Sequence, residues 1–215
     1  MAERDQSAVL VPVRNQQPDR LTQRFRHVFR RSAVAAGQAD LDSRNRPPGL
    51  IYELTDRGDI VRYGWQQEKP TKAELSVVPK DEFLSELINA GPNQKTYSVP
   101  HLMPHSTPIL DDNFFLHREI LIWRYLALGC TPKPEGLSCN PAPQQFGVLI
   151  PTQHASEIVT VDFKGKEKIS LKGKDVECNS FRLHTDDNNF LVYMDDQRKV
   201  VRIVAAASGL EVLRD

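Results

Sequence analysis

Apolar and polar residues alternate through the second half of the chain, from residue 146 onward. Six β-rich runs stand there: FGVLIP, EIVTVDF, EKISL, DVECNSFRLHT, FLVYMD and VVRIVAA. Short polar segments of the kind that favours turns separate them, including KGK twice, DDNN and DDQRK. Phe181 and Leu183 alternate with Arg182 and His184, as in a strand with one buried and one solvent-facing side. The pattern predicts an antiparallel meander of six strands.

The first half of the chain predicts fewer regular elements. Residues 1–19 are polar and contain two prolines, so we expect a polar N-terminal arm or an edge strand there. The β-rich runs LIYEL and IVRYGW flank the turn-like segment TDRGD, which predicts a hairpin.

The segment PKDEFLSELINAGP predicts a short helix near residues 81–90. Pro79 and Asp81 suit a helix start, and apolar residues follow at helical spacing. Gly91 and Pro92 would end the helix.

The most apolar stretch of the chain is ILDDNFFLHREILIWRYLALGC, residues 109–130, which predicts a long helix near 113–128. Asp111 and Asp112 suit its N-terminus, because carboxylates accept hydrogen bonds from the first free N–H groups. The helix is apolar on most sides, which predicts that protein surrounds it. Its charged residues, including Arg118 and Glu119, argue against a membrane span, which needs roughly 20 predominantly apolar residues.

These elements predict an α+β fold that is mostly β. We expect a largely antiparallel sheet of eight or more strands, with one long apolar helix and one short helix. A chain of 215 residues is long enough for one large domain, and we assign residues 20–215 to it.

Overall charge recruits no particular partner. The 28 basic and 28 acidic residues cancel, so no net field attracts nucleic acid or an anionic membrane. The exception is RLTQRFRHVFRR, residues 20–31, with a candidate basic patch at Arg24, Arg26, Arg30 and Arg31. A solvated basic face and a phosphate- or headgroup-binding patch are both consistent with it.

Three cysteines bear on the compartment. Cys130 and Cys139 enclose the Pro/Gly-rich loop TPKPEGLS, and a disulfide between them would restrain a segment that has no core-forming content. The alternative to this disulfide is that Cys130 and Cys139 are two free thiols that flank the loop. We expect the disulfide, and with it an extracytoplasmic (periplasmic or secreted) location. The segment MAERDQSAVL lacks the profile of a signal peptide, so we assume that a leader preceded the printed sequence.

No residues match the spacing of a catalytic or cofactor motif. His101 and His105 are four residues apart, but the prolines around them forbid a helix, so we expect solvated loop histidines and predict no metal. Glycine-rich phosphate loops and nucleophilic serine motifs are absent from the sequence, and we predict no cofactor. One functional hypothesis is nevertheless a hydrolase whose residues meet only in the folded chain, drawing on His101, His105, His117 and Asp112.

The last part of the chain resembles a known group. The run from FGVLIP through GKEKISLKGK to MDDQRKVVRI, closing on EVLRD, resembles bacterial exported domains of unknown function that are similar to the lipoprotein-carrier half-barrel. The resemblance covers roughly residues 105–215. It implies a strongly curved antiparallel sheet with a helix in its concave face, and relatives of that shape bind acyl chains or envelope partners. The insertion CTPKPEGLSC departs from the pattern.

The sequence therefore predicts a non-catalytic exported binding module that holds an apolar, lipid-like ligand or an envelope partner. The alternative is a structural or interaction protein of the cell envelope without a small ligand. Aromatic residues on or near the predicted helix and hairpin are the candidates for a ligand groove: Trp65, Phe114, Phe115, Trp123 and Tyr125.

Overall fold

The computed structural model describes residues 50–55, 57–67, 73–89, 95–111, 115–134, 136–186, 188–205 and 207–214. The predicted N-terminal arm, the candidate basic patch at residues 24–31 and the groove candidate Phe114 lie outside these ranges.

Five strands form a first antiparallel sheet, in which each strand pairs with the next along the chain. They are β1 (Leu50–Leu54), β2 (Ile60–Gln67), β3 (Ala73–Lys80), β4 (Phe83–Asn89) and β5 (Tyr97–His101). The β1–β2 pair confirms the hairpin predicted from LIYEL and IVRYGW.

Six strands form a second antiparallel sheet of the same meander type. They are β8 (Gln144–Ile150), β9 (Ala155–Leu171), β10 (Lys174–His184), β11 (Asn189–Met194), β12 (Val200–Ala205) and β13 (Leu210–Leu213). One predicted turn is wrong, because residues 164–166 (KGK) continue β9. There Gly165, at φ +108, lies opposite a register shift on β10, so the glycine serves a β-bulge instead of a turn.

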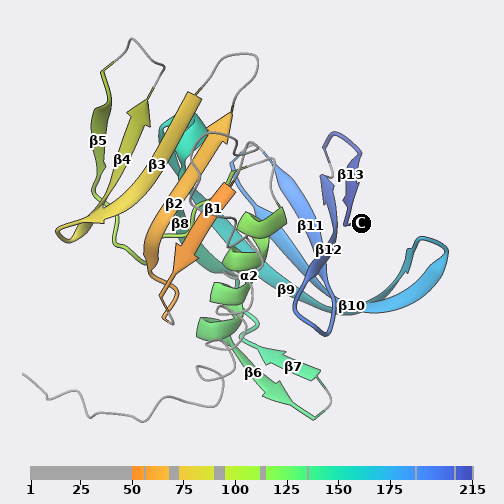
Figure 1. The fold of residues 1–215 in the computed structure, drawn as a ribbon. Coiled ribbons are helices and arrows are strands. Elements are labelled where there is room, and N and C mark those ends of the chain that lie inside the picture. The colour runs from red at the N-terminus through yellow and green to blue at the C-terminus, as the bar shows by residue number, and fades with distance from the viewer. Residues whose placement is uncertain are drawn as a thin grey trace, which may run out of the picture.

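The long apolar helix is confirmed as α2 (Phe115–Gly129), which lies between the two sheets (Figure 1). Its buried side chains share one core cluster with residues of both sheets, such as Tyr63 and Leu84 of the first and Val161 and Phe181 of the second. The two-stranded hairpin β6 (Cys130–Lys133) and β7 (Gly136–Cys139) follows the helix, and the short 3-10 helix η1 (Pro151–Gln153) joins β8 to β9.

Over the residues that the structure describes, the fold is mostly β and antiparallel, as predicted, but the strands divide into sheets of five, six and two strands and form no closed barrel. This differs from a single curved sheet of eight or more strands. A helix that is apolar on most sides needs cover on more than one side, and two sheets provide it. In the described part of the chain, no helix has both the length and the hydropathy to cross a membrane.

The short helix predicted near residues 81–90 is wrong, because this segment is strand β4. Asp81, at φ 54, and Glu82 make a two-residue turn, after which β4 pairs with β3. Aspartate tolerates this left-handed conformation, so the residue taken as a helix start serves a hairpin. The apolar residues fit either structure in so short a segment, and pairing with β3 and β5 decided for the strand.

Candidate functional site

The face of the second sheet that points away from α2 carries a groove. Ser156, Ile158, Thr160 and Asp162 occupy alternate positions of β9 and therefore share this face. The residues between them include Val159 and Val161, which are fully buried on the helix side.

Two adjoining pockets make up the groove. The larger has a volume of about 600 Å³, the smaller about 250 Å³, and Thr160 and His184 line both. The larger is also lined by Met103, Gln145, Gly147, Ser156, Glu157, Ile158, Thr185 and Asp186, and the smaller by Asp162, Arg182 and Asn189. Polar and apolar groups are therefore mixed along one concave surface.

The apolar part of the groove is the Gly147–Ile158 pair, where β8 and β9 lie opposite each other. Ile158 is 60% exposed although it lies within a sheet, because its partner Gly147 has no side chain to cover it. A side chain begun at Gly147 would meet only the terminal methyl of Met103, at 3.6 Å.

The polar part of the groove is held by contacts within β9 and between neighbouring strands. Arg182 donates to Asp162 at 2.9 Å, and Lys164 donates to the same carboxylate at 3.2 Å. His184 Nδ1 lies 2.8 Å from Asn189 Oδ1. The charge of Asp162 is thus matched within the chain, and the groove offers mainly hydrogen-bonding groups to a ligand.

A buried carboxylate with two imidazoles joins the two sheets beside this groove. Glu86 of β4 is fully buried; its Oε2 lies 2.8 Å from His101 Nε2 and its Oε1 lies 2.6 Å from His154 Nδ1. When the carboxylate is ionised it accepts from both ring nitrogens, each ring being in the tautomer that carries hydrogen on that nitrogen. The cluster therefore ties β4 and β5 to the β8–β9 connection. Met103 and Ser156 of the groove are each two residues from one of its histidines.

Replacing Glu86 with glutamine is expected to lower the free energy of unfolding by about 1 to 2 kcal/mol. The amide has a single acceptor oxygen, so one imidazole would have to change tautomer and accept from the amide N–H2 instead. Urea denaturation measures the change. The control is Glu157→Gln, at a half-exposed carboxylate of β9, which is expected to stay within about 0.5 kcal/mol. Equal losses in the two variants would contradict a special role for Glu86.

A second polar cluster lies inside the core at the start of α2. His117 Nδ1 lies 3.0 Å from the amide nitrogen of Asp111, which donates to it, and the ring packs between Tyr52 and Tyr63 at centroid distances of 5.8 and 5.6 Å. Burial lowers the pKa of His117 to about 4. The Asp111 carbonyl, 3.2 Å from Nδ1, would favour a protonated ring and so opposes this shift, while the neighbouring Arg118 guanidinium adds to it. Burial also raises the pKa of Tyr52 and of Tyr63. His117 is therefore a neutral imidazole at neutral pH.

The aromatic groove candidates lie elsewhere. Trp123 and Tyr125 are 1% and 0% exposed in the core, whereas Trp65 and Phe115 are half-buried at its margin. None of these four side chains lines either pocket of the groove.

The histidines singled out in the sequence do not share a partner. His101 binds Glu86, so its prediction as a solvated loop residue is wrong; its side chain is 10% exposed. His105 contacts the carbonyl of Phe83 at 3.1 Å, and His117 contacts the backbone of Asp111. In the described ranges, no group of three or more His, Cys, Asp or Glu side chains is arranged to hold a metal ion.

Sequence reasoning missed Glu86 and His154. Glu86 lies between Leu84 and Ile88 on the inward side of β4, and the helical interpretation of that segment hid this alternation. His154 has no local signal, since it is brought to Glu86 from 68 residues away.

The predicted disulfide between Cys130 and Cys139 is confirmed, and Cys178 is a buried free cysteine. The disulfide is compatible with an extracytoplasmic location. Comparison of the chain with family models, curated proteins and solved structures gave no significant match.

Proposed function

We propose that the chain is a non-catalytic binding module whose ligand lies in the groove on the outer face of β8–β11. The observation that carries this proposal is the exposed Gly147–Ile158 floor of a pocket with a volume of about 600 Å³. Ligand sites are concave, with apolar contact area and a few polar groups that fix orientation. The groove combines these features.

The lining chemistry favours an amphiphilic ligand over a purely apolar one. Ile158 and Met103 offer apolar contact, while Gln145, Thr160 and His184 offer hydrogen-bonding groups along the same groove. A ligand with a short apolar part and a polar, hydrogen-bonding part fits both. A lipid-like molecule with a headgroup belongs to this class, in line with the proposed kinship to the lipoprotein-carrier group. We further propose that the module acts outside the cytoplasm.

Replacing Gly147 with leucine is expected to abolish ligand binding, because the new side chain would fill the groove beside Met103. Extraction of the purified protein in denaturing solvent, followed by mass spectrometry, identifies a co-purified ligand. Titration with a dansyl-labelled fatty acid then compares the variants. Ile158→Gln, at an exposed position, is expected to leave stability within about 0.5 kcal/mol and to weaken binding about tenfold.

The matched control is Gly64→Leu, at a strand glycine of the first sheet. It is expected to bind the dansyl probe as the unmodified protein does. The proposal fails if the unmodified protein carries no extractable ligand and does not bind the probe. It also fails if Gly147→Leu binds as tightly as Gly64→Leu.

A further inference from the structure

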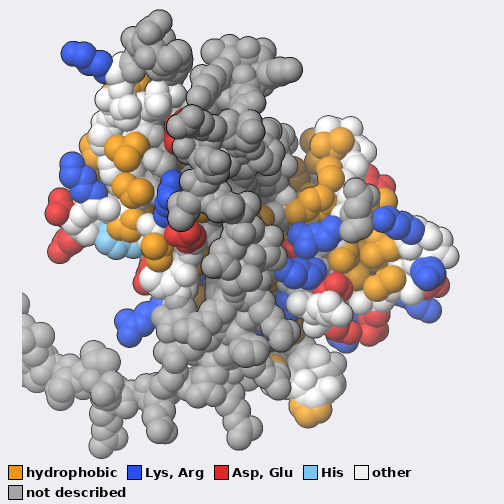
Figure 2. All heavy atoms as spheres, viewed as in Figure 1, with side chains coloured by type: hydrophobic (Ala, Val, Ile, Leu, Met, Phe, Trp, Pro, Cys, Tyr) orange, Lys and Arg blue, Asp and Glu red, His pale blue; other side chains and the backbone are white. Residues whose placement is uncertain are grey.

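The hairpin of β6 and β7, residues 130–139, projects from the end of α2 and is called the finger below. Figure 1 shows it beyond the end of α2, and Figure 2 shows apolar side-chain atoms at its far end. On the β7 side, Gly136 lies close to the side chain of Lys166 of β9. Strands β6 and β7 pair with each other alone among the described strands. The finger therefore extends neither of the two large sheets.

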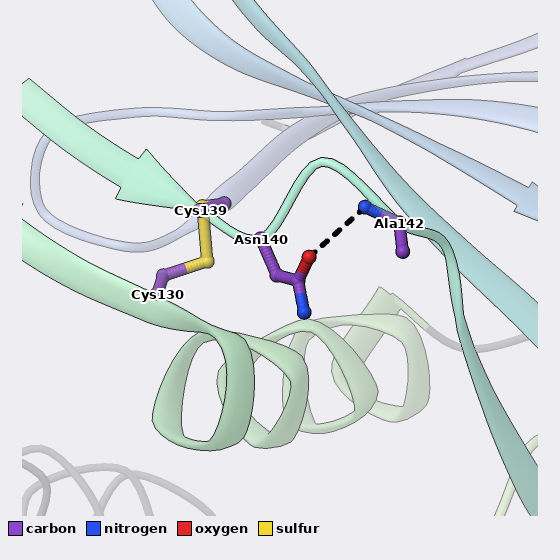
Figure 3. Close-up of a disulfide and its surroundings, with 4 residues drawn as sticks. All are labelled: Cys130, Cys139, Asn140 and Ala142. Carbon is purple, nitrogen blue, oxygen red and sulfur yellow. Dashed lines mark hydrogen bonds between the residues drawn. A yellow bond between two sulfur atoms is a disulfide. The ribbon is translucent and has the colours of Figure 1, made fainter.

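The base of the finger is held in place by several ties. The Cys130–Cys139 disulfide closes it, and Gly129 O accepts a hydrogen bond from Asn140 N at 2.8 Å just below that disulfide. Asn140 Oδ1 then accepts from Ala142 N at 3.1 Å, which fixes the turn into β8 (Figure 3). Cys130 is buried, and Leu137 packs against the main core. These ties hold the finger in one direction.

The outer part of the finger is exposed despite this anchoring. Thr131, Pro132, Lys133 and Pro134 are all exposed, and Leu128, in the last turn of α2 beside the base, is 69% exposed. Two prolines restrict the backbone there, so little conformational entropy remains to be lost on association. Lys133 is the only cation between the two cysteines; the only acidic residue, Glu135, lies outside the described ranges.

A disulfide and two prolines thus hold rigid a segment whose outer part contributes little to the core. Rigid presentation of a loop favours binding because the ordering cost is met before the partner arrives. Lys133 offers one positive charge at an exposed end of the hairpin that also carries two exposed prolines.

We propose that the finger is a recognition element that inserts into a pocket of a partner protein. The pocket has apolar walls that contact Pro132 and Pro134, and a carboxylate that pairs with the ammonium of Lys133. This inference does not depend on the groove of the second sheet, because the finger and the groove share no residue.

Site-specific photocrosslinking in cells that naturally express the chain tests the proposal. The full-length protein carries p-benzoylphenylalanine in place of Pro134 or, as a control, of Lys174. Lys174 is exposed at the start of β10, beside the turn of another projecting hairpin. We expect a discrete crosslinked product from position 134 alone. Mass spectrometry of that product is expected to map the link to a partner segment containing aspartate or glutamate.

Charge variants show whether the crosslink depends on the proposed contact. In the protein crosslinked from position 134, Lys133→Glu is expected to reduce the product about tenfold, Lys133→Arg to retain it, and Lys174→Glu to leave it unchanged. All three changes lie at exposed positions, and unfolding midpoints verify that the fold is kept. The proposal is overturned if positions 134 and 174 give the same products. It is also overturned if Lys133→Glu has no effect, or if the linked partner surface lacks acidic residues.

Discussion

Replacing Trp123 with alanine is expected to lower the free energy of unfolding by about 3 to 5 kcal/mol. The indole is 1% exposed within the shared core, and its Nε1 donates to the carbonyl of Arg198 at 2.9 Å. The ammonium of Lys199 lies 5.5 Å from the ring centroid, so the ring also supports the β11–β12 connection. Alanine would leave a cavity between α2 and the second sheet. Urea denaturation followed by circular dichroism measures the loss.

Trp123→Phe is the matched control for the packing component. It keeps most of the ring volume but removes the N–H donor, and is expected to cost about 1 to 2 kcal/mol. Trp123→Ala and Trp123→Phe, under conditions in which they are folded, are each expected to bind the groove ligand as the unmodified protein does. Loss of ligand with nearly unchanged stability in Trp123→Ala would instead support the original assignment of Trp123 to a ligand groove.

Acidification from pH 6.5 to pH 4 is expected to remove about 3 kcal/mol of stability through His117 alone. The pKa of the buried imidazole is about 4 in the folded chain, below its ordinary value of 6.5. The unfolded chain therefore takes up a proton first as the pH falls, and this favours unfolding. The stability associated with the neutral His117 imidazole is fully present above pH 6.5 and is lost as the pH falls toward 4. Urea denaturation across this range measures it.

His117→Asn separates this effect from the titration of other groups. The asparagine oxygen can accept from Asp111 N–H as the imidazole does, but it does not titrate. The variant is expected to be less stable at pH 7, because a ring is lost between Tyr52 and Tyr63. Its stability is expected to fall less steeply between pH 6.5 and 4. The same slope in both proteins would contradict a neutral, buried His117.

A buried carboxylate of α2 shows why the sequence indicated the helix but not its contacts. Glu119 is 1% exposed and accepts from Lys199 at 3.1 Å, from the backbone of Val200 at 3.0 Å and from Arg214 at 2.7 Å. In the sequence it is only a charge that interrupts an apolar run. Its role depends on a residue 95 positions away, which no local pattern could indicate.

The candidate groove was not predictable for a similar reason. In the sequence, Ser156, Thr160 and Asp162 have the pattern of the solvent-facing side of an ordinary strand. Gly147 indicates only a strand position without a side chain to pack. Only the pairing of Gly147 with Ile158, with Met103 brought across from the loop after β5, produces a concave apolar floor. Sequence reasoning placed all the aromatic candidates except Trp65 on the helix, where packing between two sheets buries Trp123 and Tyr125.

The sequence by itself determined most strands of the second sheet, the β1–β2 hairpin, the long apolar helix and the disulfide. These features depend on side-chain periodicity, turn residues and cysteine spacing, all of which act over a few residues. The tertiary structure decided that residues 83–89 form a strand, that the strands divide into two large sheets, and that Glu86 meets His101 and His154. The physical reason is that pairing partners and burial depend on contacts between distant segments, whose energies exceed weak local preferences.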